Sequence, residues 1–421
     1  MRLIPGPFFG IITRMFEFLR HKKGPVICQR QDHCISRKNI DPDALKVLYR
    51  LNSLGYKAYL VGGGVRDLLL GRTPKDFDVG TDAKPNEVKR AFRNCFLVGR
   101  RFRLAHVRFG QKVIETATFR ANSQTVGDII EHAGEGPMED NTFGTPETDA
   151  NRRDFTVNGL FYDIKTFSVI DYVGGFKDLK KKVIRSIGDP MIRFREDPVR
   201  MMRAIKFSSR LDFEIERKTA KAMCALHSCI LNAAKPRVCE EVFRLFSYGS
   251  AEKAFRMMWK SGMLGDLLPD LAQYITRSGG LKSPEWKYLA MLDRYDRGMA
   301  KHGIEVSNAI RMAVLYAPYV REERAAAGKN AGGTARQILG GMLRTLGVPK
   351  TTYFTAVILS DSERRLSQPP QRGHIRFVRN RDFPDALDYN RIVARVEGRD
   401  ERVLDKWADA YENQPTDETK K

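Results

Sequence analysis

The chain has 421 residues, 42% of them hydrophobic, which is too many for one ordinary core and favours two or three domains. Lys and Arg number 73 against 51 Asp and Glu, and the net charge of +22 favours nucleic acid as a polyanionic partner. A generic basic surface and contact with an anionic membrane are the alternatives. No run of about 20 apolar residues is present, which excludes a membrane-spanning helix.

The six cysteines show no Cys-x-x-Cys spacing, so we expect reduced thiols in a cytoplasmic protein. A metal cluster is the alternative for one group near the N-terminus, but its spacing fits no standard zinc pattern. That group is His21, Cys28, His33 and Cys34.

The first twenty residues, MRLIPGPFFGIITRMFEFLR, are apolar and basic. Pro5 and Pro7 interrupt the apolar run and no small-residue cleavage site follows, so the segment makes a poor signal peptide. We expect a basic, flexible arm over residues 1–38, with peripheral membrane contact as an alternative.

A helix is expected from Asp41, a good N-cap followed by Pro42, to a stop at Gly55. A strand at residues 57–61, a turn at Gly62–Gly64 and a short helix through Leu70 follow. Further along the chain we expect a strand at 76–79, a helix at 85–93, and strands at 96–98, 104–109 and 113–119.

Residues 121–150 are rich in glycine, proline and acids, which predicts a long loop. From about residue 189 to 360 the apolar spacing is mostly helical. The predicted fold class is therefore α+β, with a small mixed-sheet head followed by an all-helical part.

The stretch KDFDV carries two carboxylates, Asp76 and Asp78, that share a face if they lie on one strand. Such a pair repels unless a cation lies between its members, and Mg²⁺ takes one or two carboxylates together with substrate phosphates. Glu115 is the best candidate for a third carboxylate. A solvated strand edge is the alternative interpretation of an isolated Asp-x-Asp.

The glycines just before these carboxylates suit a phosphate-binding turn, because Gly62–Gly64 leave backbone N–H groups unhindered. The start of the short helix adds partial positive charge, and Arg66 adds a guanidinium. A triphosphate held there would lie close to metal ions held by the strand.

Five segments, in this order, resemble the class II nucleotidyltransferases, which comprise bacterial poly(A) polymerases and CCA-adding tRNA nucleotidyltransferases. The segments are GGGVRDLLLG with KDFDV, RRDFTVNGL, YVGGFKDLKKKVIRSIG and REDPVRMMRAIKF, and the match covers residues from about 40 to 270. The resemblance implies these domains: an arm at 1–38, a nucleotidyltransferase head at 39–175, a helical neck at 176–270, a helical body and tail at 271–411, and a disordered end at 412–421.

The resemblance also implies residue roles. Asp76 and Asp78 would bind the metal and be catalytic, and Asp154 would belong to the active site. Glu115, the candidate third carboxylate from the strand pattern, is counted with the catalytic residues. The residues expected to bind the nucleotide are Gly62, Gly63, Arg66, Arg153, Asn158, Asp197, Arg200 and Arg203.

The last three of these residues would read the base edge, since a carboxylate and a guanidinium fork can imitate a pairing partner. Asp197 is otherwise explained as a helix N-cap, and Arg200 and Arg203 as surface charges. Relatives often carry another Arg where this chain has Lys206, and Lys lacks the bidentate fork.

The segment FLVGRRFRLAHVRFG, residues 96–110, resembles the poly(A) polymerase signature rather than the CCA-adding one. It carries a basic ribbon suited to RNA phosphates, with a solvated strand edge as the alternative. The ribbon consists of Arg100, Arg101, Arg103 and Arg108. His106 is expected to be packed or hydrogen-bonded rather than a general base.

Taken together, we expect a template-independent polymerase that adds AMP from ATP to RNA 3′ ends, with Mg²⁺ as cofactor. A CCA-adding or partially CCA-adding tRNA enzyme is the close alternative, and a catalytically silent RNA-binding protein is the alternative from another class. We expect a monomer whose partners are RNA 3′ ends, ATP and RNA-decay proteins.

Overall fold

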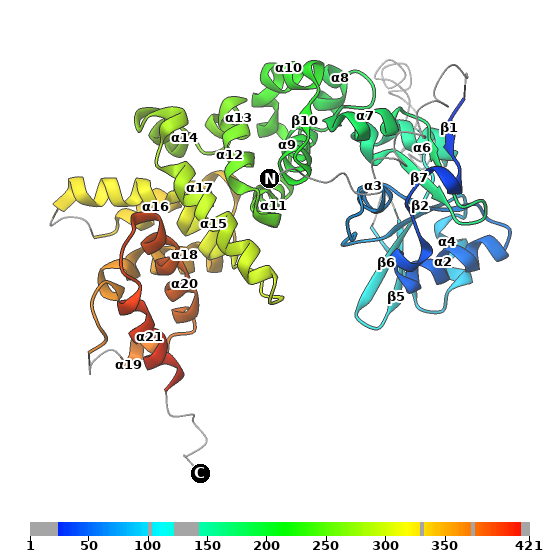
Figure 1. Ribbon diagram of the computed structural model, residues 1–421. Helices are drawn as coiled ribbons and strands as arrows, with labels where there is room; N and C mark the ends of the chain where they lie inside the picture. The colour runs from blue at the N-terminus through cyan, green and yellow to red at the C-terminus, as the bar shows by residue number, and fades with distance from the viewer. Residues whose placement is uncertain (1–23, 100–102, 122–142, 329–331, 372–374, 414–421) are drawn as a thin grey trace, which may run out of the picture. The chain divides into compact units, whose positions relative to one another are not determined.

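The computed structural model describes residues 24–99, 103–121, 143–328, 332–371 and 375–413 (Figure 1). The chain divides into two compact units, the first running to Arg193 and including Glu214–Thr219, the second holding Phe194–Phe213 and the chain from Ala220 onward. Every strand of the described residues lies in the first unit, and the described part of the second unit is built from helices. The predicted α+β class is confirmed.

The first unit is organised around an eight-stranded mixed sheet in the order β1-β8-β7-β2-β3-β6-β5-β4. Neighbouring strands run antiparallel apart from β3 and β6, which are parallel. The strands are β1 (Val26–Cys28), β2 (Ala58–Val61), β3 (Asp78–Thr81), β4 (Cys95–Val98), β5 (Leu104–Phe109), β6 (Lys112–Thr118), β7 (Leu160–Asp163) and β8 (Ser168–Asp171). A separate parallel pair joins β9 (Val183–Ile184) to β10 (Glu214–Ile215).

Residues 24–38 belong to this fold, which corrects the prediction of a flexible arm through residue 38. Strand β1 pairs with β8, and Cys28 and Ile35 are buried in the head core. His33 contacts the Phe167 carbonyl oxygen through Nε2 at 2.8 Å. All six cysteines are free, and in the described residues Cys28 and His33 serve packing rather than a metal cluster.

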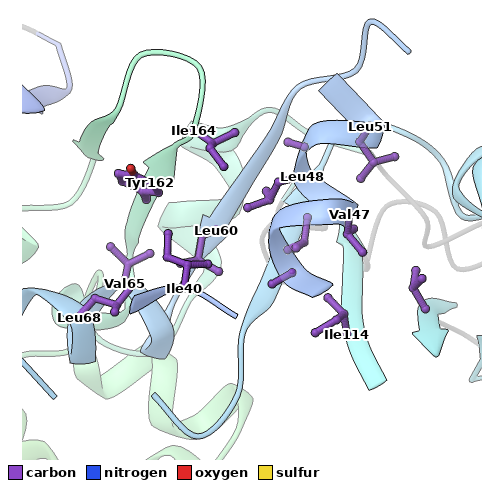
Figure 2. Close-up of a cluster of buried hydrophobic side chains, with 14 of the residues drawn as sticks. Ile40, Val47, Leu48, Leu51, Leu60, Val65, Leu68, Ile114, Tyr162 and Ile164 are labelled. Carbon is purple, nitrogen blue, oxygen red and sulfur yellow. The ribbon is translucent and has the colours of Figure 1, made fainter. Parts of the chain in front are cut away.

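One face of the sheet is covered by helices α2 (Pro42–Ser53) and α4 (Pro85–Ala91). The predicted cap of α2 is confirmed, because Asp41 Oδ1 accepts from the N–H groups of Asp43 at 2.8 Å and Ala44 at 3.4 Å. Leu48 and Leu51 of α2 are fully buried against the strands (Figure 2). The short helix after the glycines is α3 (Gly63–Leu69).

The predicted loop at 121–150 is only partly a loop. Residues 122–142 lie outside the described residues, and α6 (Pro146–Arg152) occupies the end of the range. Thr145 is the N-cap of α6, with its hydroxyl accepting from the Thr148 N–H at 3.3 Å, and Pro146 stands at the first helical position. This N-cap and proline are a helix-start signal that the glycine-rich composition obscured.

The segment DYVGGF after β8 serves a structural purpose. The Asp171 carboxylate accepts four backbone N–H groups, those of Val173, Gly174, Gly175 and Phe176, at 2.9 to 3.0 Å. The carboxylate is buried and ties the end of β8 to the start of α7 (Gly175–Lys181).

The second unit holds the remaining helices, and no described helix is long and apolar enough to cross a membrane. At its start, α8 (Pro190–Glu196) and α10 (Arg217–Leu226) each straddle the division between the units. The others are α9 (Val199–Leu211), α11 (Lys235–Leu245), α12 (Ala251–Lys260), α13 (Met263–Leu267), α14 (Pro269–Arg277), α15 (Glu285–Ala300), α16 (Asn308–Ala327), α17 (Thr334–Leu346), α18 (Lys350–Leu366), α19 (Ile375–Val378), α20 (Phe383–Glu397) and α21 (Arg402–Glu412). Of the predicted disordered end, Glu412 closes α21 and residues 414–421 lie outside the described residues.

We predict that Asp171→Ala lowers the free energy of unfolding by about 3 kcal/mol, because four backbone donors lose a buried charged acceptor. Urea unfolding of the full chain, followed by circular dichroism, measures the effect. Asp163→Ala is the control, since this more exposed carboxylate accepts from only one backbone N–H, that of Lys165. An equal loss in both variants would contradict the importance of the Asp171 turn.

Candidate active site

The turn after β2 is built around Gly62, which has a φ of +72° and caps the start of α3. A side chain at this position would be strained, and its Cβ would lie 2.8 Å from Arg153 Nη1. Gly64 has a second purpose, because a Cβ there would lie 3.3 Å from the Asp76 carbonyl oxygen. The glycines therefore let Arg153 and the chain segment bearing Asp76 approach the same turn.

Arg66 is buried behind this turn rather than exposed to solvent. Its side chain is 2% exposed, and its Nε and Nη2 donate to Asp67 Oδ1 at 2.9 and 2.7 Å. Nη1 donates to Asn158 Oδ1 at 2.5 Å, and Asn158 Nδ2 donates to Asp154 Oδ1 at 3.0 Å. Arg66 thus orients Asn158, and Asn158 orients Asp154.

The carboxylates of the opening motif meet at the beginning of β3. The strand starts at Asp78, so the prediction that Asp76 lies on it is wrong, because Asp76 ends the exposed connection from α3. Glu115 lies on the neighbouring strand β6, one position before the Val79–Thr116 pair, and so stands beside Asp78. Ile114 and Thr116 are buried on the opposite face of the sheet.

The charges at this point are only partly compensated. Burial, together with the carboxylates of Glu115 and Asp76, raises the pKa of Asp78 to about 6, while Arg153 acts to lower it. Two acidic side chains, Glu115 and Asp76, thus act on one half-buried carboxyl, which is an arrangement that a divalent cation would stabilise.

The donor set fits Mg²⁺, which prefers hard oxygen ligands. Among the described residues, no group of three or more His, Cys, Asp or Glu side chains is arranged to hold a metal by itself. In proteins Mg²⁺ usually takes one or two carboxylates and completes its coordination with substrate phosphates and water.

A buried carboxylate that the sequence analysis missed holds Arg153 in place. Asp149 Oδ2 accepts from Arg153 Nε at 3.2 Å and Nη2 at 2.9 Å, and Asp149 Oδ1 accepts from Arg152 Nε at 2.8 Å. Although burial acts to raise it, the two guanidinium groups hold the pKa of Asp149 below its ordinary value. The Arg153 guanidinium also lies 5.2 Å from the centre of the Phe161 ring.

The residues predicted to read the base belong to the second unit. Asp197 lies between α8 and α9, where its Oδ1 accepts from the Val199 N–H at 3.2 Å. Its Oδ2 accepts from Arg237 Nη2 at 2.9 Å, so the carboxylate makes a helix-start contact and an ion pair at once. Arg200 donates to Glu196 Oε2 at 3.0 Å.

Glu241 of α11 organises the rest of this helix face. It lies 2.6 Å from Lys206 Nζ, 3.1 Å from Arg244 Nη1 and 4.0 Å from Arg203 Nη1. Burial, followed by repulsion from Arg203, lowers the pKa of Lys206 to about 8, against the opposing effect of Glu241. Lys206 is therefore an ion-pair partner of Glu241 inside the unit.

The basic ribbon is described only in part, because Arg100 and Arg101 lie outside the described residues. Arg103 is exposed and lines a cavity of about 550 Å³ with three further cations, which are Lys84, Arg90 and Arg120. Arg108 is exposed on β5, with its guanidinium 5.9 Å from the Phe96 ring centre. His106 is half-buried, with Nε2 3.9 Å from Glu115 Oε1.

Sequence reasoning missed the buried acids that position these groups. Asp149 precedes Arg153 by one helical turn, a spacing that was hidden inside the predicted loop. Arg237 and Glu241 have the same spacing on α11, but nothing in the sequence indicates that Glu241 pairs with Lys206 of α9 or that Arg237 pairs with Asp197 just before α9.

We predict that Glu115→Gln lowers the pKa of Asp78 in the metal-free protein, because it removes a neighbouring negative charge. A carboxyl-carbon NMR titration with labelled aspartate measures the shift. Glu147→Gln, at an exposed position of α6, is the control and leaves the Asp78 titration unchanged.

The raised pKa of Asp78 also determines the direction in which the free energy of unfolding changes with pH. A carboxyl whose pKa is raised from 3.8 to about 6 loses its contribution to stability as pH rises through that range. The loss of stability with rising pH is smaller in Glu115→Gln than in the wild type. If the pKa of Asp78 is identical in these two proteins, the carboxylates of Glu115 and Asp78 are not coupled and the prediction is wrong.

Comparison with known families places these features in context. Residues 58–185 match the model described as "Poly A polymerase head domain", and residues 212–275 match "Probable RNA and SrmB-binding site of polymerase A". Poly(A) polymerase I of Salmonella typhi is 38% identical over 406 residues, covering 93% of this chain and 87% of that protein. Poly(A) polymerase I of Escherichia coli O6:H1 is 37% identical with the same coverage.

CCA-adding enzymes are similar over a shorter part of the chain. The enzyme of Lactobacillus helveticus is 36% identical over 229 residues, which cover 54% of this chain and 55% of that protein. Among solved structures, the CCA-adding enzyme of Bacillus stearothermophilus in complex with CTP has a TM-score of 0.66. It is 24% identical and covers 90% of this chain and 84% of that one, which supports a shared fold.

The resemblance seen in the sequence motifs is thereby confirmed. Because relatives more than 30% identical extend over nearly the whole chain, this protein belongs to the bacterial poly(A) polymerase I family of nucleotidyltransferases.

Proposed function

We propose that this protein is a poly(A) polymerase that adds AMP from ATP to RNA 3′ ends without a template. The observation that carries the proposal is the extent of similarity: poly(A) polymerase I sequences match 93% of the chain, whereas the CCA-adding enzyme of Lactobacillus helveticus matches 54%. In the proposed reaction, the RNA 3′-oxygen bonds to the α-phosphorus of ATP while the bond to the β-phosphate oxygen breaks. The hydroxyl loses its proton and pyrophosphate leaves.

In this proposal Asp76 and Asp78 hold Mg²⁺, and Glu115 adjusts the charge beside them. When bound, Mg²⁺ supplies positive charge to the phosphate oxygens and lowers the pKa of the attacking hydroxyl. Asp78 must be ionised to act as a ligand, and its raised pKa means that protons compete with the metal below about pH 6. Asp154, oriented by Asn158, is proposed to complete the acidic side of the site.

The nucleotide side of the site rests on positioned cations and backbone. Gly62 and Gly63 let a phosphate approach the turn, and Arg153 binds it in an orientation that Asp149 maintains. Because Arg66 is buried, we propose that it acts on the sugar side through Asn158 rather than by contacting phosphate directly.

In the second unit, Asp197, Arg200 and Arg203 are proposed to read the base edge. Arg237 and Glu241 restrain Asp197 and Arg203, which limits the rotamers that these groups sample. Arg103 and Arg108 are proposed to bind RNA phosphates, together with Arg100 and Arg101. A cytoplasmic monomer that works with RNA-decay proteins remains our prediction.

We predict that Asp78→Ala reduces AMP transfer by about 10³-fold or more, since a metal ligand is removed from the reacting phosphate. Asp76→Ala should have a similar effect. Neither change should lower stability much, because Asp76 is exposed and, at Asp78, the burial and the repulsion from Glu115 and Asp76 that are removed oppose the lost attraction of Arg153. Extension of radiolabelled RNA measures transfer, circular dichroism measures folding, and Glu147→Ala is the matched control on an exposed acid.

Substantial transfer by Asp78→Ala would contradict the metal assignment. If the wild-type protein binds RNA but transfers nothing with Mg²⁺ and ATP, the alternative of a catalytically silent RNA-binding protein would replace our proposal.

Similarity to CCA-adding enzymes keeps tRNA end repair as a second candidate function. We predict that wild-type protein extends an unstructured RNA with ATP and does not require a tRNA. Four parallel reactions decide this, in which unstructured RNA or a tRNA lacking its CCA end is offered ATP or CTP alone. CTP incorporation confined to the tRNA would replace poly(A) synthesis by CCA addition.

A further inference from the structure

In the part of the chain that the structure describes, helices cover only one face of the sheet at β4, β5 and β6, and the other face carries exposed side chains. Side chains on these strands alternate, and one set, including Cys95, Val107 and Ile114, is buried towards α2 and α4. The opposite set includes Phe96 and Val98, which are 57% and 47% exposed. Unlike the helix-covered face, this face therefore leaves large apolar side chains in contact with solvent.

The exposed side chains form a row that leads to the carboxylates. Phe96 pairs with His106, and His106 pairs with Glu115. Glu115 stands beside Asp78 across the parallel pair, so one side chain from each of four adjacent strands lies on the same line. Three strand spacings separate Phe96 from Asp78, a distance of about 14 Å between backbones.

Cationic charge accompanies the aromatic end of this row. Arg108 lies on the same face, one residue pair along β5 from His106, and its guanidinium is 5.9 Å from the Phe96 ring centre. An exposed aromatic ring beside a guanidinium is the usual combination for single-stranded nucleic acid, in which a base stacks and the neighbouring phosphate is neutralised.

We propose that this face is the platform for the RNA primer, with a base a short distance upstream of the 3′ end stacked on Phe96 and its phosphate on Arg108. The inference rests on the proposed function and names the path by which the primer reaches Asp78. Glu115 lies between the aromatic end of the row, at Phe96, and the acidic end, at Asp78. Because Glu115 is negatively charged, the phosphodiester chain binds at Arg108 and continues from there towards the metal ligands.

A single exposed phenylalanine is ordinary on a protein surface. Here, Val113 is also 38% exposed on the same face, opposite Arg108, so exposed apolar side chains stand on β4 and on β6, on either side of β5. The row ends at the acidic group proposed to hold Mg²⁺, and the chain carries a net charge of +22. Charge complementarity and continuity with the site both favour RNA over a second copy of this chain as the occupant.

The test is the affinity of the full chain for a labelled oligoadenylate, measured by fluorescence anisotropy without ATP or Mg²⁺. Phe96→Ala should weaken binding at least about fivefold, Phe96→Leu should behave like it, and Phe96→Tyr should retain the wild-type affinity. Arg108→Gln should weaken binding and reduce its salt dependence by about one counterion. In extension assays, Phe96→Ala should raise the KM for the oligoadenylate and leave the KM for ATP unchanged.

Matched controls separate the platform from general surface effects. Phe354→Ala removes a similarly exposed ring, 48% exposed, from α18 in the second unit, and Arg50→Gln removes an exposed cation from α2. Both should bind oligoadenylate as the wild type does.

Wild-type affinity in Phe96→Ala and Phe96→Leu would overturn the proposal. The proposal would also be overturned if Phe96→Ala changed self-association, measured by sedimentation, and left the RNA affinity unaltered. In that case the edge strand β4 would be an interface with a second copy of this chain. Because binding is measured without catalysis, these outcomes stay interpretable even if the wild-type protein transfers no AMP.

Discussion

The parallel pairing of β3 with β6 places Glu115 beside Asp78, where burial and then the repulsion between the two carboxylates raise the pKa of Asp78 to about 6. In the rest of the sheet neighbouring strands run antiparallel, so this junction is where two separate hairpin-like parts of the chain meet. The half-buried carboxyl of Asp78 is costly to ionise at this junction. A divalent cation bound with a triphosphate would remove the cost, which couples substrate binding to the protonation state of the site.

The remaining groups of the proposed site are held by buried ion pairs. Arg66 is fixed by Asp67, and Arg153 by Asp149, so each guanidinium has a restricted orientation before any substrate arrives. The same principle is repeated in the second unit, where Glu241 gathers Lys206 and Arg203. Preorganised dipoles and charges of this kind lower the reorganisation that a transition state requires. Each also leaves a buried charge unpaired if its partner is removed, so the supporting acids are as sensitive to substitution as the groups they hold.

Much of the first unit could be predicted from local patterns. The α2 cap at Asp41, the strands that became β4, β5 and β6, and the glycine turn were all expected and are present. Strand β1 was missed because its short edge segment is recognisable only by its pairing with β8. Helix α6 was missed because the residues before it are rich in glycine and proline, which predicted a loop. The Thr145–Pro146 helix-start signal was too short to change that prediction. Asp76 was placed on a strand because alternation continues to it, although pairing with β2 begins only at Asp78.

The fold class and the family could be predicted from the amino-acid sequence alone, because both depend on short ordered motifs and on local periodicity, and the same motifs supply Asp76 and Asp78 as the proposed metal ligands. Only the tertiary structure decided how the charges are matched. The contact of Arg66 with Asn158, the ion pair of Lys206 with Glu241 and the row from Phe96 to Asp78 all join residues that are distant in sequence through sheet register or helix packing. Register depends on which strands become neighbours, and the parallel contact of β3 with β6 joins segments more than thirty residues apart. No local sequence pattern predicts that these two segments pair, so the interactions between the charged groups of the site are established only when the sheet forms.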